Sequence, residues 1–285
     1  MTIVFPEPVR IELITNGYHF DALSVGPKGG DVVLFLHGFP QFADAWLPIM
    51  KAVAREGFHT VAVEQRGYSP GARPLNTNDY KIEHLASDVL GFAEELGAES
   101  FHLVGHDWGG LVAWQVAAEF PQRLRSLTVL STPHNDAVLS AIATDADQRE
   151  RSRYIDFFRQ PGHVAEHEML ANNATRLRSV YKGKLSDTAI DENVRRFSED
   201  GALTAVLNWY RALDFQARIG EISVPALFIW GSNDHALGET AARNTAHFVT
   251  APYRFEVLDD KSHWLLEEAP DLIAPLLLGH LRHSS

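Results

Sequence analysis

The sequence of 285 residues contains no cysteine. This absence excludes a disulfide-bonded scaffold, a thiol nucleophile, a CxxC redox pair and zinc or iron–sulfur sites with cysteine ligands. Basic residues are also few: 25 Lys and Arg stand against 37 Asp and Glu, which gives a net charge of −12 with His neutral. Because binding to nucleic acid needs a basic surface, we expect no nucleic-acid partner.

Long hydrophobic runs are missing as well. The longest ones, such as Val32–Leu36 and Leu276–Leu278, are far shorter than the roughly 18 residues that a membrane span needs. The segment Met1–Val9 contains two prolines and a glutamate, and lacks the basic start and apolar stretch of a signal peptide. We therefore expect a cytoplasmic protein without a membrane segment.

Short runs of β-branched and aromatic residues alternate with segments of helical periodicity, such as residues 82–96. Several runs are apolar on both faces, as in the strands of a covered parallel sheet, and Asn16-Gly17 predicts a hairpin near the start. The pattern predicts an α/β fold, a mostly parallel sheet flanked by helices. The predicted strands are Val9–Ile14, Tyr18–Val25, Asp31–His37, Phe58–Glu64, Phe101–Gly105, Leu124–Leu130, Ala226–Trp230 and Arg254–Leu258.

The alternation stops between His134 and Arg218, where charged helical segments occur without a strand pattern. We therefore expect a helical cap, residues 134–218, inserted into a core that consists of residues 1–133 and 219–285. Ser186 is the expected N-cap of one cap helix. The predicted cap helices are Gln148–Phe158, His163–Leu170, Asp187–Phe197 and Leu203–Phe215.

The segment Gly105-His-Asp-Trp-Gly109 joins a predicted buried strand to a predicted helix, Leu111–Glu119. Small residues two positions on either side of the centre are typical of a nucleophile elbow, a turn too sharp for side chains there. The central residue is Asp107, where serine hydrolases carry Ser. A carboxylate is ionised near neutral pH and can attack an sp³ carbon that bears a leaving group, forming an ester. A helix-capping role of Asp107 is the alternative.

Two more residues complete a catalytic pattern. Asp234 lies in the polar turn after a predicted strand, and His263 follows the last predicted strand. The order nucleophile, acid, base is that of the α/β-hydrolase triad with Asp in place of Ser. Its place in this order distinguishes His263 from the other histidines among the 14 in the chain. Asp136, after the preceding strand, is a second candidate for the acid.

The loop Phe35–Pro40 follows a buried strand and can direct the backbone N–H of Phe39 at the site. The N–H of Trp108, the residue after the nucleophile, would be the second donor of an oxyanion hole. We assign His37 a structural role.

Several motifs of the chain resemble those of the epoxide hydrolases, a family of α/β-hydrolases with a helical lid. The resemblance covers nearly the whole chain and implies the α/β-hydrolase fold. The motifs are His37–Gln41, Gln65–Tyr68, Gly105–Gly110, the turn with Asp234, and Ser262–Trp264.

The resemblance extends to the lid. Asn208–Arg211 resembles the lid motif whose tyrosine binds the epoxide oxygen, which assigns that role to Tyr210, and the segment 154–162 resembles the one that supplies the second tyrosine, Tyr154. Opening an epoxide creates an alkoxide, and two O–H donors can share its charge or supply a proton. Glu64 departs from the pattern, since relatives generally have Asp there.

The implied reaction converts an epoxide and water into a vicinal diol without cofactor or metal. Asp107 attacks a ring carbon; His263, oriented by Asp234, then activates the water that hydrolyses the ester. Phe39 and Trp108 stabilise the oxyanion. Ionised Asp107 and neutral His263 predict a pH optimum near or above neutrality. The residues expected to contact the substrate are Trp108, Phe39, Phe158 and Leu207.

Alternatives remain open. Haloalkane dehalogenases share the Asp nucleophile, and the indole of Trp108 could bind a halide, but Phe39 stands where those enzymes typically have Asn. Fluoroacetate dehalogenases share the His-Gly-Phe-Pro loop, but carry Arg in place of Trp108. A non-catalytic, ligand-binding relative is a third possibility. The segment His163–His167 matches the zinc pattern H-x-x-E-H without an evident third ligand, so we expect no metal. We expect a monomer or homodimer, and a role in detoxification is one hypothesis.

Overall fold

The computed structural model describes residues 7–283, so the segment 1–6, part of the stretch considered for a signal peptide, lies outside the described residues. Within residues 7–283 the chain forms one eight-stranded sheet in the order β1-β2-β4-β3-β5-β6-β7-β8. The pairs β1/β2 and β2/β4 are antiparallel, and the other pairs are parallel. The strands are β1 Val9–Thr15, β2 Tyr18–Val25, β3 Val32–Leu36, β4 His59–Val63, β5 Phe101–His106, β6 Leu124–Leu130, β7 Ala226–Gly231 and β8 Tyr253–Leu258.

The predicted opening hairpin is confirmed. Thr15 pairs with Tyr18, and the two residues between them, Asn16 and Gly17, have φ angles of 52° and 79°. Positive φ at both central residues is what a tight two-residue hairpin turn requires, and Asn-Gly adopts it readily.

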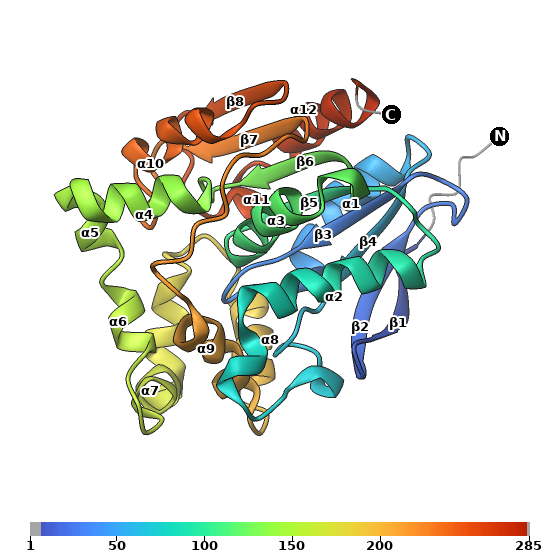
Figure 1. Cartoon of the computed structure of the whole chain (residues 1–285). Coiled ribbons are helices and arrows are strands. Elements are labelled where there is room, and N and C mark those ends of the chain that lie inside the picture. The colour runs from blue at the N-terminus through green and yellow to red at the C-terminus, as the bar shows by residue number, and fades with distance from the viewer. Residues whose placement is uncertain (1–6, 284–285) are drawn as a thin grey trace.

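Helices cover both faces of the sheet, with α2 and α3 on one face and α1 and α12 on the other (Figure 1). Side chains of β3 alternate between them: Leu34 and Leu36 pack in the core beside α2 and α3, whereas Val33 and Phe35 pack beside α1 and α12. Burial on both faces explains the apolar runs in the sequence. The helices of the core are α1 Leu47–Ala54, α2 Ile82–Glu95, α3 Trp108–Glu119, α10 Glu239–Asn244, α11 Leu265–Glu268 and α12 Pro270–His283.

Short 3₁₀ helices occupy several of the connections between these elements. They are η1 Ala43–Trp46, η2 Pro70–Ala72, η3 Thr77–Tyr80, η4 Pro121–Arg123 and η5 Thr245–Phe248.

A helical insertion separates β6 from β7, as predicted. Figure 1 shows α6, α7, α8 and α9 grouped together at one end of the molecule, whereas α4 lies beside α10 of the core. No helix within residues 7–283 combines the length and apolarity needed to cross a membrane. The helices of the insertion are α4 Asn135–Thr144, α5 Ala146–Arg151, α6 Tyr154–Phe158, α7 Val164–Val180, α8 Asp187–Phe197 and α9 Ala202–Ala212.

Two predicted helix boundaries in the insertion are wrong for tertiary reasons. The predicted helix 148–158 is two helices, because Gln148 and Arg151 donate hydrogen bonds to the carbonyls of Ala236 and Asp234 and hold α5 against the loop after β7. The predicted helix 203–215 ends at Ala212. The guanidinium of Arg159 binds the carbonyls of Tyr210 and Leu213 there.

Other parts of the insertion differ less. The helix α8 has the predicted bounds, and Ser186 accepts a hydrogen bond from the backbone N–H of Ala189, as an N-cap does. The predicted helix 163–170 continues to Val180 as α7, but its backbone is non-helical at residues 171–174, with positive φ at Asn172, Asn173 and Ala174. The helix α4 was not predicted.

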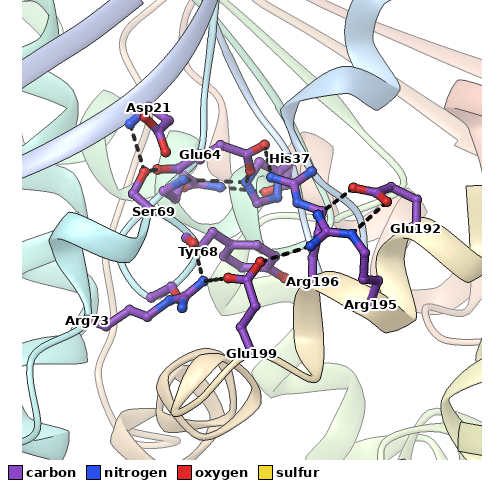
Figure 2. Close-up of polar contacts among 12 residues, drawn as sticks. Asp21, His37, Glu64, Tyr68, Ser69, Arg73, Glu192, Arg195, Arg196 and Glu199 are labelled. Carbon is purple, nitrogen blue, oxygen red and sulfur yellow. Dashed lines mark hydrogen bonds and ion pairs between the residues drawn. The ribbon is translucent and has the colours of Figure 1, made fainter.

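An ion-pair cluster connects the insertion to the core (Figure 2). Arg196 of α8 lies 2.6 Å from Glu64, which follows β4, and its guanidinium stacks 3.5 Å from the ring centroid of Phe42. The other oxygen of Glu64 lies 3.5 Å from His37 Nε2. Burial raises the pKa of Glu64 to about 7, against the opposite effect of Arg196. Glu64, the residue that departs from the family pattern, therefore contacts the insertion directly.

We expect Arg196→Gln to lower the free energy of unfolding by about 2 kcal/mol, because it leaves the carboxyl of Glu64 buried without its cation. The matched control is Arg195→Gln, since the neighbouring guanidinium is mostly exposed and pairs with Glu192 of the same helix; its stability should equal that of the wild type. Urea titrations followed by circular dichroism measure both. Equal losses in the two variants would show that the buried pair contributes no more than a surface charge.

Candidate active site

The turn between β5 and α3 holds Asp107 in an unusual backbone conformation, with φ 52° and ψ −120°. A Cβ on Gly105 would lie 2.2 Å from the carbonyl oxygen of Gly109, and one on Gly109 would lie 2.1 Å from that of Leu36. This confirms the prediction that the turn leaves no room for side chains at these positions. The hydroxyl of Thr132 donates to the Asp107 carbonyl at 2.9 Å and fixes the turn from β6.

The carboxylate of Asp107 has different partners at its two oxygens. Oδ1 accepts a hydrogen bond from the backbone N–H of Phe39 at 2.7 Å, and the backbone N–H of Trp108 also contributes. Oδ2 faces Nε2 of His263 at 3.4 Å. The two predicted oxyanion donors thus lie at the nucleophile, and one oxygen points toward the predicted base.

Asp234 and His263 lie together behind the nucleophile. Nδ1 of His263 is 2.8 Å from Oδ2 of Asp234, whose other oxygen accepts from the backbone N–H groups of Ala236 and Leu237. Asp136, the other candidate for the acid, instead accepts from the backbone of residues 219 and 220. The hydrogen bond to Asp234 places Nε2 of His263 toward Asp107.

Two residues that the sequence did not identify support His263. Its backbone carbonyl accepts from the hydroxyl of Ser131 at 3.0 Å and lies 2.9 Å from Nε2 of His106. Ser131 follows β6 and His106 ends β5, so the loop that carries His263 is fixed to the same strands as the nucleophile.

The charges of the three residues are coupled. Burial lowers the pKa of His263, but the carboxylates of Asp234 and Asp107 outweigh this and raise it to about 10. Burial likewise opposes ionisation of Asp107, yet the hydrogen bond and charge of His263 hold its pKa below the ordinary 3.8. At neutral pH Asp107 is therefore ionised and His263 carries a proton.

Tyr154 and Tyr210 come from α6 and α9, with ring centroids 6.1 Å apart. Burial raises the pKa of both phenols far above 10, and the nearby Asp107 carboxylate acts in the same direction. Both groups therefore keep their protons and can donate hydrogen bonds across the physiological pH range.

Two cavities meet at Asp107, Tyr154 and Tyr210, the three residues that line both. The first, of about 170 Å³, follows α4 and is here called the α4 cavity; its apolar lining includes Leu111, Val138, Leu139, Ile142, Leu213 and Phe215. The second, of about 350 Å³, follows α7 and is called the α7 cavity; it contains His263, and its apolar lining includes Phe157, Met169, Val180 and Trp264.

Three of the four residues expected to contact substrate line a cavity: Trp108 lines the α4 cavity, and Phe39 and Phe158 line the α7 cavity. Leu207, the fourth, lines neither of these two cavities. It is fully buried in the hydrophobic core, because the face of α9 that carries it packs inward.

The zinc-like pattern at the start of α7 has other partners. Glu166 forms an ion pair with Arg211 at 2.8 Å, and Nδ1 of His163 lies 3.3 Å from the same carboxylate. Among residues 7–283, no group of three or more His, Asp or Glu side chains is arranged to hold a metal ion.

Comparisons with known proteins agree with the fold and with the motifs. The family described as alpha/beta hydrolase fold matches residues 31–270. The AB hydrolase superfamily protein YfhM of Bacillus subtilis is 32% identical, over 94% of this chain and 96% of its own length. Epoxide hydrolase A of Mycobacterium tuberculosis is 30% identical, over 94% of this chain and 95% of its own length.

A solved structure gives the same result. The crystal structure of an epoxide hydrolase from Bacillus megaterium in complex with an inhibitor superposes with a TM-score of 0.87 at 26% identity, and covers 95% of this chain and 100% of that one. Fold, motifs and full-length similarity agree, and the chain belongs to the α/β-hydrolase fold family and, within it, to the epoxide hydrolase family.

Proposed function

We propose that the protein is an epoxide hydrolase that forms a covalent ester on Asp107. The observation that carries this proposal is the position of the nucleophile: the Asp107 carboxylate and the phenols of Tyr154 and Tyr210 line the junction between two cavities, and the base His263 lines the α7 cavity beside them. The relatives that are named epoxide hydrolases support it.

In the first step, Oδ2 of Asp107 attacks a ring carbon of the epoxide. Oδ1 accepts from the N–H of Phe39, which leaves Oδ2 as the reacting atom. The C–O bond of the ring breaks, and its oxygen receives a proton from Tyr154 or Tyr210 as the charge develops. The products of this step are a hydroxyalkyl ester on Asp107 and a phenolate that is reprotonated from solvent.

In the second step, His263 removes a proton from water, and the resulting hydroxide attacks the carbonyl carbon of the ester. Esterification removes the negative charge of Asp107, one of the two carboxylates that raise the pKa of His263. Burial then lowers this pKa, so that the imidazolium gives its proton to solvent and the neutral imidazole acts as the base. The oxyanion forms at Oδ1, beside the N–H donor of Phe39, with that of Trp108 as the second donor. Its collapse breaks the bond between the acyl carbon and the diol oxygen, which takes the proton from His263, and the Asp107 carboxylate is restored.

The insertion completes this site. We propose that residues 134–218 form a cap on the core segments 1–133 and 219–285, because both phenols come from the insertion and the other reacting groups come from the core. A halide leaves without a proton, so a dehalogenase has no need of paired phenols, whereas the alkoxide of an opened epoxide does. The pair of Tyr154 and Tyr210 therefore favours the epoxide over the haloalkane.

Parallel assays test the proposal. We expect the wild type to consume styrene oxide and form the diol, and to release no halide from a bromoalkane. Asp107→Asn should abolish diol formation, because an amide cannot form the ester. Chromatography of the diol and a halide assay measure the two reactions. Halide release without diol formation would identify a dehalogenase. The absence of both reactions would indicate a non-catalytic relative.

Replacement of either phenol should slow epoxide opening. We expect Tyr154→Phe and Tyr210→Phe each to reduce the rate of ester formation roughly 10- to 100-fold, because one of two donors to the epoxide oxygen is lost. Tyr253→Phe is the matched control, since that hydroxyl is buried on β8 and has no hydrogen-bond partner among residues 7–283. Stopped-flow fluorescence in single turnovers measures the rate. A normal rate in both active-site variants would remove the tyrosines from the mechanism.

The two steps should respond differently to pH. Ester formation needs ionised Asp107, whose pKa lies below 3.8, so its rate should stay constant from pH 6.5 to 10. Ester hydrolysis needs neutral His263, so its rate should rise with pH through a pKa below 10, the value in the resting enzyme. Single-turnover traces over this range separate the steps. A hydrolysis rate independent of pH would exclude His263 as the base.

A further inference from the structure

The lining of the α7 cavity is rich in cations, although the protein as a whole is acidic. Its lining includes the cations Arg151, Arg176 and Lys182, and within the described part of the chain Asp107 is the one carboxylate of the lining. The whole chain, by contrast, carries a net charge of −12. Positive groups are therefore concentrated around a cavity that leads to the nucleophile.

A half-buried histidine in this cavity responds to the positive charge. Desolvation, together with the charges of His263, Lys182 and Arg151 and against that of Asp234, lowers the pKa of His235 to about 4. His235 consequently stays neutral at neutral pH, and the cations in the lining favour an anion in the cavity.

One of the three cations is already occupied by the protein. Arg151 donates to the backbone carbonyl of Asp234 at 2.6 Å and pairs with Asp147 at 2.6 Å. Arg151 thus holds the loop that carries Asp234. It adds positive charge to the cavity, but its guanidinium already binds protein groups.

The other two cations are available. The guanidinium of Arg176 stacks 3.6 Å from the ring centroid of Phe157, another lining residue, and its ion pair with Glu168 is long, at 4.0 Å. Lys182 has no ion-pair partner within residues 7–283. Both side chains are exposed, so they lie where the cavity opens to solvent.

On the other side of the nucleophile, the α4 cavity is lined mostly by apolar side chains of α4, α6 and the segment after α9. A substrate with its epoxide at the junction of the two cavities would place one end among cations and can extend the other among apolar groups.

We propose that the α7 cavity binds the anionic end of the substrate: the enzyme acts on epoxides that bear a carboxylate, which Arg176 and Lys182 bind at the mouth of the cavity. This inference rests on the proposed epoxide hydrolase activity. The two cations offset the repulsion that a carboxylate substrate meets from Asp107 and from the acidic surface. Arg176 supplies a planar pair of donors that suits a carboxylate, and Lys182 adds a point charge.

A pair of probes that differ by one charge tests the proposal: epoxyundecanoate and its methyl ester. We expect the wild type to prefer the acid in kcat/KM, and the preference to fall at high ionic strength. In the double variant Arg176→Gln/Lys182→Gln, the ratio of the kcat/KM values for acid and ester should fall roughly five-fold or more, mainly through the KM of the acid.

The matched control is Arg178→Gln/Lys184→Gln, which removes the same charge from the same helix and loop. These two residues pair with Asp191 and Glu268 and do not line the cavity. The acid-to-ester ratio should equal that of the wild type. Equal ratios in all three proteins would overturn the proposed site and leave the hydrolase activity intact.

Binding separates failure of this inference from failure of the proposed function. Calorimetry with undecanoate, which has no epoxide, should show binding to the wild type and the control and at least roughly five-fold weaker binding to the Arg176→Gln/Lys182→Gln variant. If neither probe is hydrolysed but this difference holds, the proposed reaction fails and the carboxylate site stands. Equal binding to all three proteins would contradict the carboxylate site.

Discussion

The turn at Asp107 is the constraint on which the site depends. A non-glycine residue at φ 52° costs about 1–3 kcal/mol, and such strain persists only where the surroundings enforce it. Here Gly105 and Gly109 allow the strand and helix to approach within contact distance, and Thr132 binds the carbonyl of the turn. The conformation directs the carboxylate out of the sheet, to the place where Phe39 and His263 reach it. The same turn sets α3 behind the nucleophile.

The charge balance of the site follows from that position. His263 lies between two carboxylates, so its pKa rises and that of Asp107 falls. In the proposed mechanism, ester formation removes one of these charges, and the imidazole changes from a charge partner into a base without any movement of the backbone. Asp234 keeps its position throughout, because two backbone N–H groups and Arg151 hold its loop.

The sequence predicted the parts of the structure that depend on local patterns. The strands follow from apolar runs, the hairpin from Asn16-Gly17, and the proximity of Asp107, Asp234 and His263 from their order after strands whose carboxyl ends share one edge of the sheet. The positions of Tyr154 and Tyr210 came from the resemblance to a family, since helical periodicity alone does not distinguish them from core residues.

Features that depend on distant contacts were not predictable in this way. The break between α5 and α6 is caused by hydrogen bonds to the loop after β7, and the inward face of α9 that buries Leu207 depends on its packing. Arg176 follows the non-helical residues 171–174, so a periodicity that assumes a straight helix cannot place it at the cavity. Glu64, noted only as a departure from a motif, binds the insertion through Arg196.

The central claim is that the carboxylate of Asp107 becomes part of a covalent ester during each turnover. The most direct measurement is a single turnover in ¹⁸O-labelled water with enzyme in excess, followed by mass spectrometry of the diol and of the peptide that contains Asp107. The ester route predicts a first diol without solvent label and one labelled oxygen in Asp107. A labelled first diol with an unlabelled Asp107 would contradict the account, because water would then have attacked the epoxide directly.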